Sequence, residues 1–328
     1  MQFNSIVFPH PRASYTSAEL YGNLIYIPRD SEQWTITAPF VSFSLAANIR
    51  DKQSALRPCG SFTGPCVPCL FLPTKRQTTK ILIHFHGNAE DVGQARKLLK
   101  TIRHELHVHV IAVEYRGYGV YREGEPAADS LLEDADLVYR YITTVLHFSP
   151  EDVIVFGRSI GSGPSCYLAS KYSLHSLVLM SGFTSLREVA KGFVGSVLQF
   201  LVAERFENKE WLGSARCPVF IVHGRRDHLV PPKHALALRD AVKSQVKLHM
   251  PEDMDHNSFS FLQDFIYPLL QFYEEQGLSV DYRLKESATN TTGSGSSRSE
   301  CGAEGELESP GAAVKFYIPI KSFNRPTK

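Results

Sequence analysis

The sequence predicts an α/β protein with a mostly parallel central sheet and helices on both faces. Short strands alternate with helical segments from about residue 80 to 274. These strands are almost wholly apolar, as expected where both faces of a sheet are buried, and they lack the polar alternation of a sheet with one wet face. The chain has 328 residues, 43% of them hydrophobic, which is enough to bury a large core.

β-branched and apolar runs mark the strands, and apolar residues at helical spacing mark the helices. Residues 127–146 show that spacing most clearly. Residues 48–66 form a Pro-, Gly- and Cys-containing insertion without an assignable element. In chain order, the expected elements are strands 24–27, 40–45, 69–72 and 80–85, helix 90–104, strand 108–114, helix 127–146, strand 152–156, a helix after 162, strands 174–180 and 219–224, helix 234–243, strand 245–250 and helix 258–274.

The most informative segment is Gly157-Arg158-Ser159-Ile160-Gly161, which follows a buried strand and precedes the helix-opening residues 162–165. A serine on a tight strand-to-helix turn is the nucleophile of an α/β-hydrolase. Such a turn strains the backbone of the serine, and larger residues at 157 and 161 would collide with the adjoining strand and helix. We therefore predict the α/β-hydrolase fold, with Ser159 as its nucleophile.

Two partners for this serine follow in the expected order. Asp227 comes just after strand 219–224, and His256 lies in the loop after the last strand. Serine, acid and histidine in this order are typical of α/β-hydrolases, and all three lie beyond the carboxyl ends of strands. We predict that His256 takes the proton of Ser159 while Asp227 orients the imidazole. Asp255 is the alternative acid, disfavoured because a residue adjacent to a histidine rarely reaches its Nδ1.

An acyl-transfer site also needs backbone N–H donors for the oxyanion of the tetrahedral intermediate. One such donor usually follows the nucleophile, and a second comes from the loop after an earlier strand. We assign these donors to the amides of Ile160 and Asn88, the latter in the segment His86-Gly87-Asn88. The alternative interpretation of His86-Gly87 is a simple strand terminator.

Residues 184–216 are long enough to form a short helical lid between two strands. Their apolar segment 193–202 would line a slot for a fatty chain, or it would form a helix packed on the sheet. We divide the whole chain into an extended segment 1–23, an α/β-hydrolase domain 24–277 and a low-complexity tail 278–328, expected to be disordered. An apolar island at 314–320 either belongs to that tail or docks on the domain or on a partner.

Composition argues against several other classes. The net charge is +1, so we expect no nucleic-acid partner. Six cysteines without a secretory leader favour reduced thiols in a cytoplasmic protein, and no run reaches the roughly 18 apolar residues of a membrane-spanning helix. Cys66-Val67-Pro68-Cys69 has the spacing of half a zinc site, but no second pair lies near it. We expect neither a metal nor a cofactor.

Several motifs resemble those of one branch, the group of α/β-hydrolase domain-containing protein 17, membrane-associated enzymes that remove palmitate from protein cysteines. They are His86-Gly87-Asn88-Ala89-x-Asp91, Tyr115-Arg116-Gly117-Tyr118-Gly119, Gly157-Arg158-Ser159-Ile160-Gly161 and His223-Gly224-Arg225-Arg226-Asp227-x-x-Val230. The resemblance implies the same nucleophile, acid and base as above. The group carries a lipidated N-terminal cysteine cluster, whereas the first cysteine here is Cys59.

The sequence therefore predicts a serine hydrolase of acyl thioesters or esters, with S-palmitoylated protein as the favoured substrate. One alternative is a serine peptidase or a lipid or small-ester hydrolase on the same fold. Another is a binding protein without catalysis. We expect a cytoplasmic monomer that meets an acylated protein or lipid-like substrate, with peripheral membrane contact left open.

Overall fold

The computed structural model describes residues 8, 12–34, 64–191, 205–278 and 314–315, and the fold is given for these residues. The expected strand 40–45 and nearly all of the insertion 48–66 lie outside them. So do residues 192–204 of the predicted lid and most of the predicted tail. Among the described helices, none combines the length and apolarity that crossing a bilayer requires.

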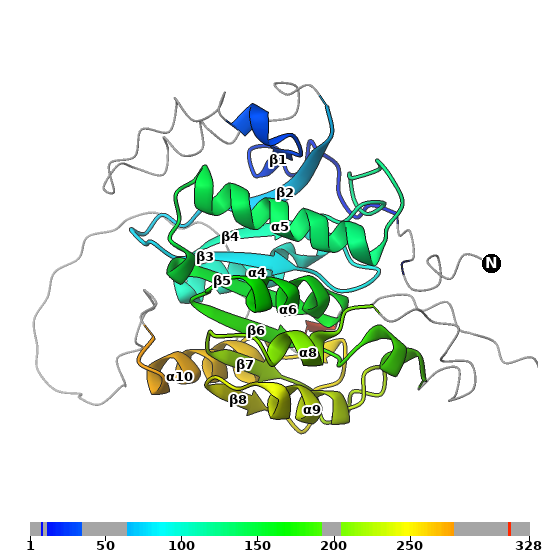
Figure 1. Ribbon diagram of the computed structural model, residues 1–328, viewed down its shortest axis with the longest axis vertical. Helices are drawn as coiled ribbons and strands as arrows, with labels where there is room; N and C mark the ends of the chain where they lie inside the picture. Colours follow the sequence, from blue (N-terminus) through cyan, green and yellow to red (C-terminus); the bar gives the residue numbers. More distant parts are fainter. Residues whose placement is uncertain (1–7, 9–11, 35–63, 192–204, 279–313, 316–328) are drawn as a thin grey trace, which may run out of the picture.

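Eight strands form one sheet, in the order β1-β2-β4-β3-β5-β6-β7-β8 (Figure 1). β1 and β2 pair antiparallel with each other, and β2 pairs antiparallel with β4. All pairs from β4 through β3 to β8 are parallel, which confirms the mostly parallel sheet. The strands are β1 Leu24–Pro28, β2 Cys66–Leu72, β3 Ile81–Phe85, β4 His109–Val113, β5 Val153–Arg158, β6 Ser176–Met180, β7 Val219–Val222 and β8 Val246–His249.

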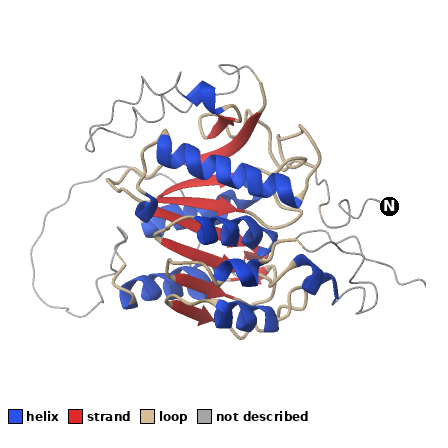
Figure 2. Cartoon of the chain, in the orientation of Figure 1, coloured by secondary structure: helices blue, strands red, loops and turns tan. Residues whose placement is uncertain are grey.

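Helices cover both faces of this sheet (Figure 2). Alternate strand residues enter two separate cores, because successive side chains of a strand point to opposite faces. Ile81 and Ile83 of β3 belong to the core under α5, α6, α8 and α9, whereas Leu82 belongs to the core under α4 and α10. These helices are α4 Val92–Leu106, α5 Ala128–Thr144, α6 Ser162–Lys171, α8 Asn208–Leu212, α9 Lys233–Ala241 and α10 Tyr267–Glu275.

The segment 258–274, expected as one helix, is divided in the structure. It begins with the short strand β9 Ser258–Phe259, continues as a π-helix over Phe261–Ile266 and becomes α-helical only in α10. Pro268 near the start of α10 has no N–H to donate to the carbonyl four residues earlier, so a regular α-helix cannot continue through this position. The single-helix prediction was therefore wrong.

Two described segments near the ends of the chain contact the domain in different ways. Residues 16–23 form hydrogen-bonded turns, with the N–H of Leu24 donating to the carbonyl of Leu20 at 2.9 Å. Tyr15 and Leu20 are buried, so this part of the predicted extended segment packs on the domain. Near the C-terminus, Val314–Lys315 forms β10, which pairs antiparallel with β9. The rest of the apolar island lies outside the described residues.

Candidate active site

The turn after β5 has the conformation that the sequence predicts. β5 ends at Arg158, Ser159–Gly161 form a 3₁₀ turn, and α6 starts at Ser162. Ser159 has a φ of 51°, in the left-handed region that residues other than glycine rarely adopt. The turn therefore holds this serine in a strained backbone conformation beside the carboxyl end of the sheet.

The two glycines of the turn leave no room for a side chain. A Cβ on Gly157 would lie 2.4 Å from the carbonyl oxygen of Gly161 and from Ser165 Oγ. A Cβ on Gly161 would lie 2.1 Å from the carbonyl oxygen of Phe85, in the neighbouring strand. Both obstacles include backbone atoms, which cannot rotate away. The close packing of strand, turn and helix therefore depends on glycine at both positions.

Gly161→Ala is accordingly expected to destabilise the protein by about 3 kcal/mol, at the upper end of what overpacking costs. The expected displacement of the turn would also slow the reaction of Ser159 with a fluorophosphonate probe. Urea unfolding and labelling rates measure the two effects. Gly213→Ala is the control, because its Cβ would come no closer than 3.2 Å to the carbonyl oxygen of Glu210, a contact that a shift of a few tenths of an ångström relieves, so it should change both quantities much less. Equal effects of both substitutions would contradict the steric argument.

The structure brings the three predicted side chains into one hydrogen-bonded chain. Nε2 of His256 lies 3.0 Å from Ser159 Oγ, and Nδ1 of the same ring lies 2.8 Å from Asp227 Oδ2. All three residues are buried. If Nδ1 donates its proton to the carboxylate, the lone pair of Nε2 faces the serine hydroxyl. This arrangement can withdraw the hydroxyl proton as the oxygen attacks a carbonyl carbon.

Asp227 is fixed independently of the histidine. Its Oδ1 accepts the backbone N–H groups of Leu229 at 3.0 Å and Val230 at 2.8 Å, which leaves Oδ2 for His256. Burial opposes ionisation, but the hydrogen bonds from His256 and Val230 hold the pKa of Asp227 below its usual value. The carboxylate is therefore ionised at neutral pH and can stabilise an imidazolium.

The alternative acid, Asp255, has another use. Its Oδ1 accepts the backbone N–H groups of Asn257 at 2.7 Å and Ser258 at 2.6 Å. These bonds shape the loop that carries His256, in the manner of an Asx turn. The two aspartates therefore have different roles. Asp227 contacts the imidazole of His256, whereas Asp255 accepts hydrogen bonds from the backbone of its own loop.

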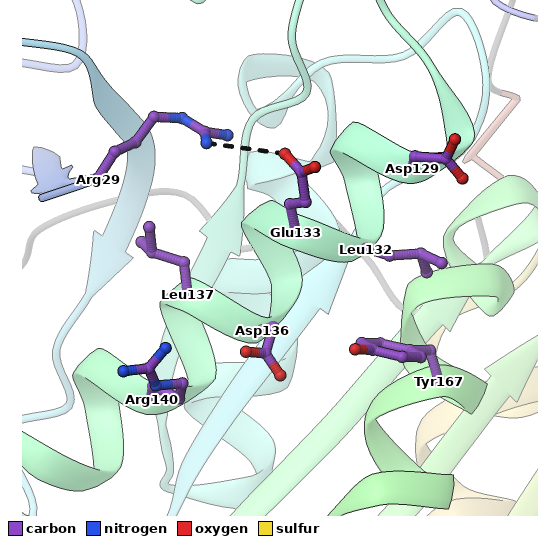
Figure 3. Close-up of a pocket in the computed structure, with 8 residues that line it drawn as sticks. All are labelled: Arg29, Asp129, Leu132, Glu133, Asp136, Leu137, Arg140 and Tyr167. Carbon is purple, nitrogen blue, oxygen red and sulfur yellow. Dashed lines mark ion pairs between the residues drawn. The ribbon is translucent and has the colours of Figure 1, made fainter. Parts of the chain in front are cut away.

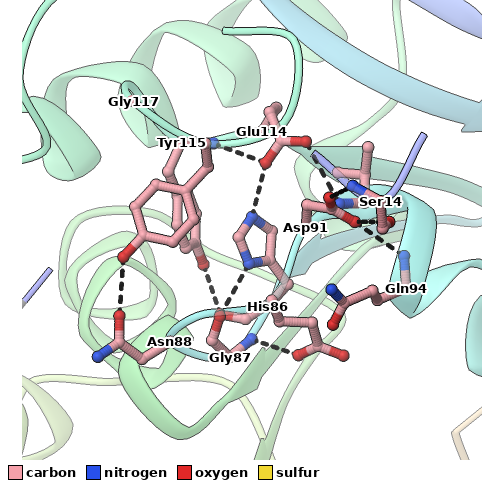
Figure 4. A network of polar contacts seen from close by, with 12 residues as sticks. Ser14, His86, Gly87, Asn88, Asp91, Gln94, Glu114, Tyr115 and Gly117 are labelled. Carbon is pink, nitrogen blue, oxygen red and sulfur yellow. Dashed lines mark hydrogen bonds and ion pairs between the residues drawn. The ribbon is translucent and has the colours of Figure 1, made fainter. Parts of the chain in front are cut away.

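The loop after β3 lies beside the serine turn, since Phe85 pairs with Gly157 in the parallel ladder. Buried side chains fix this loop (Figure 4). The hydroxyl of Tyr118 donates to Asn88 Oδ1 at 2.8 Å, and that of Tyr115 donates to the carbonyl oxygen of His86 at 2.8 Å. The loop is thus ordered next to Ser159, and the assignment of the Asn88 and Ile160 amides as oxyanion donors stays a prediction.

A buried polar network beneath this loop was not predicted from the sequence (Figure 4). His86 Nε2 lies 3.0 Å from Glu114 Oε1, and the hydroxyl of Tyr15 donates to Glu114 Oε2 at 2.7 Å. Burial disfavours the charged imidazole of His86, but its contacts with Glu114 and the nearby Glu90 raise its pKa above the ordinary value. The N-terminal segment thereby contributes to the support of the loop.

The pocket in Figure 3 is separate from these residues. It lies along α5, has a volume of about 440 Å³ and is open to solvent. Side chains of both charge signs line it, including Glu133, which pairs with Arg29 at 3.9 Å. None of the residues of the hydrogen-bonded chain lines this pocket, so it is not part of the candidate site.

Within the described residues, no group of three or more His, Cys, Asp or Glu side chains is placed to hold a metal ion. Cys66 and Cys69 lie in β2, three positions apart and therefore on opposite faces of the strand. Cys69 is buried, and Cys66 is partly exposed near the carbonyl of Gly64. Cys59 of the same sequence cluster lies outside the described residues.

Comparisons with known proteins agree with the fold described above. A family model described as alpha/beta hydrolase fold matches residues 80–210. Human Alpha/beta hydrolase domain-containing protein 17B is 28% identical over 213 residues, 65% of this chain and 73% of that protein. The 17C protein of Xenopus tropicalis is 26% identical over 213 residues, covering 65% and 67%. A solved acetyl xylan esterase from Paenibacillus sp. R4 aligns with a TM-score of 0.51 at 13% identity, over 65% of this chain and 80% of that one.

Proposed function

We propose that this protein, a member of the α/β-hydrolase superfamily, is a serine hydrolase that cleaves acyl thioesters or esters through an acyl-enzyme. The observation that carries the proposal is the hydrogen-bonded chain from Asp227 through His256 to Ser159, with contacts of 2.8 and 3.0 Å. The left-handed φ of Ser159 and the family similarity support the same assignment. The donor roles of Asn88 and Ile160 complete the proposed site.

In the first half of the reaction, Ser159 Oγ bonds to the acyl carbon as its proton passes to His256 Nε2. The carbonyl electron pair moves onto oxygen, where the amides of Asn88 and Ile160 would bind the oxyanion. Collapse of this intermediate breaks the carbon–sulfur or carbon–oxygen bond, and the leaving group departs with the proton of His256. Water then attacks the acyl-enzyme with His256 as base, releasing the carboxylic acid and restoring Ser159.

An S-acylated protein is the favoured substrate. A thioester carbonyl is more electrophilic than an amide, and a thiolate leaves without strong protonation, so this machinery suits it. The motif resemblance described above favours palmitoylated cysteine within that class. A cytoplasmic location, a monomeric state and contact with an acylated partner at a membrane surface belong to the same proposal.

Incubation with an S-palmitoylated peptide tests the substrate. We expect the wild-type protein to release free palmitate from this peptide faster than the Ser159→Ala variant does. We also expect it to cleave the thioester faster than a matched peptide in which an amide replaces the thioester. No release above the Ser159→Ala level would refute the thioester proposal. Faster cleavage of the amide would indicate a peptidase, and a wild-type protein that a fluorophosphonate probe does not label would indicate a binding protein.

A further inference from the structure

Arg158, the residue before Ser159, is a charged side chain buried beside the candidate site, with only 2% of it exposed. Its Nη1 donates to Glu90 Oε2 at 2.8 Å. Its Nη2 donates to the backbone oxygen of His256 at 3.0 Å and to Asn257 Oδ1 at 2.9 Å. One guanidinium on the serine strand therefore reaches both the loop after β3 and the loop that carries the histidine.

Glu90 extends this contact into the backbone of the loop after β3. The oxygen that pairs with Arg158, Oε2, also accepts the N–H of Gly87 at 2.8 Å. A Cβ on Gly87 would lie 2.6 Å from Arg158 Nη1 and 2.9 Å from Glu90 Oε2, so the approach of these groups requires glycine there. The segment that leads to Asn88 is thus joined to the guanidinium through a single carboxylate oxygen.

A gain in folding stability does not explain well why the buried ion pair of Arg158 and Glu90 is present. Taking two charges out of water costs about as much as their attraction returns, and a well-packed apolar pair is often as stable. The planar guanidinium does provide direction, because its N–H groups point at fixed angles. In this protein those groups are aimed at acceptors on two loops that lie 166 residues apart in sequence, at Glu90 and His256.

We propose that Arg158 is a positioning residue that, through Glu90 and through the carbonyl of His256, keeps the two loops in register with Ser159. The inference rests on the proposed function, because it explains the fixed position of the two loops relative to Ser159 by a need of catalysis. A misplacement of about 1 Å in an active site can cost about 10²-fold in rate. Since neither Arg158 nor Glu90 is assigned to substrate binding, the loss is expected in kcat.

The test is a double variant, Arg158→Met with Glu90→Gln, which removes both charges while the glutamine oxygen can still accept from Gly87. Its matched control is Arg29→Met with Asp134→Asn, which removes an ion pair between Arg29, the residue after β1, and Asp134 of α5. Arg158→Lys is the conservative variant, because its ammonium can pair with Glu90 but lacks the fork that reaches both loops. Circular dichroism establishes that each variant is folded.

Hydrogen exchange followed by mass spectrometry reports the two loops without any need for activity. We expect faster exchange at 86–91 and at 255–259 in the double variant, and no change there in the control. In steady-state kinetics we expect kcat to fall about 10²-fold while KM changes less than about threefold, the pattern of a contact that matters in the transition state. Arg158→Lys should recover part of kcat.

A folded double variant with wild-type exchange in both segments, or with wild-type kcat, would overturn the proposal. So would an equal loss of kcat in the control. If the wild-type protein neither hydrolyses thioesters nor reacts with a fluorophosphonate, the proposed function fails. The exchange measurement then still decides whether Arg158 holds the loops, because faster exchange in both segments supports the positioning role and unchanged exchange refutes it.

Discussion

Ser159→Ala is expected to lower kcat by about 10⁶-fold, the loss typical of removing the nucleophile of a serine hydrolase. The alanine has no oxygen to attack the acyl carbon, so only transition-state binding by the rest of the site remains. His256→Ala is expected to cost about the same, and the double variant little more, because the serine and the histidine act as one unit. Initial rates with a thioester substrate and the extent of fluorophosphonate labelling measure these losses.

A serine of α6, the helix that follows the turn of Ser159, provides the control for this experiment. Ser170 lies in α6, and its hydroxyl donates to the carbonyl oxygen of Tyr167 at 2.7 Å. Ser170→Ala should therefore retain wild-type turnover and labelling. Labelling that persists in Ser159→Ala but disappears in another serine variant would show that a different residue is the nucleophile.

Much of the fold follows from local patterns. The apolar strands and the helices between them are legible because each strand is buried on both faces, which produces an apolar run rather than an alternating one. The order of the strands in the sheet, in contrast, does not follow from local patterns. The pairing of β2 with β4, before β3, depends on contacts between distant segments, which no local pattern encodes. The division of 258–274, by contrast, has a local signal in Pro268, which the apolar spacing of the segment concealed.

The candidate site shows the same contrast between local and distant signals. The sequence signals for the three reacting side chains are local ones: a tight turn, the ends of strands and the order along the chain. They identify Ser159, Asp227 and His256. The residues that hold these side chains in place could not be predicted from the sequence in this way. The hydroxyl of Tyr15 reaches Glu114 across 99 positions of sequence, and Arg158 reaches His256 across 98. A charged residue directly beside a buried apolar run is the signal that could have drawn attention to them, since such residues are rarely fully buried unless paired.

Asp227→Asn is expected to lower kcat by about 10⁴-fold while the fold is retained. In the wild-type protein Asp227 Oδ2 accepts a hydrogen bond from His256 Nδ1. The asparagine can place an N–H at that position instead of an acceptor. An N–H at that position favours the tautomer whose proton is on Nε2, which then cannot accept the proton of Ser159. Burst-phase kinetics would show the loss in acylation. Asp255→Asn is the control, because its amide oxygen can still accept the N–H groups of Asn257 and Ser258.

The same substitution should change how stability depends on pH. The pKa of Asp227 is lower in the folded protein than its usual value of about 3.9, so its ionisation stabilises the fold above that pH. This contribution is lost as the pH falls through the folded-state pKa. Urea unfolding at pH 7 should therefore find Asp227→Asn less stable than wild type, with a difference that narrows below about pH 4. A constant difference, or a larger kinetic loss in Asp255→Asn, would show that Asp227 is not the carboxylate that serves His256.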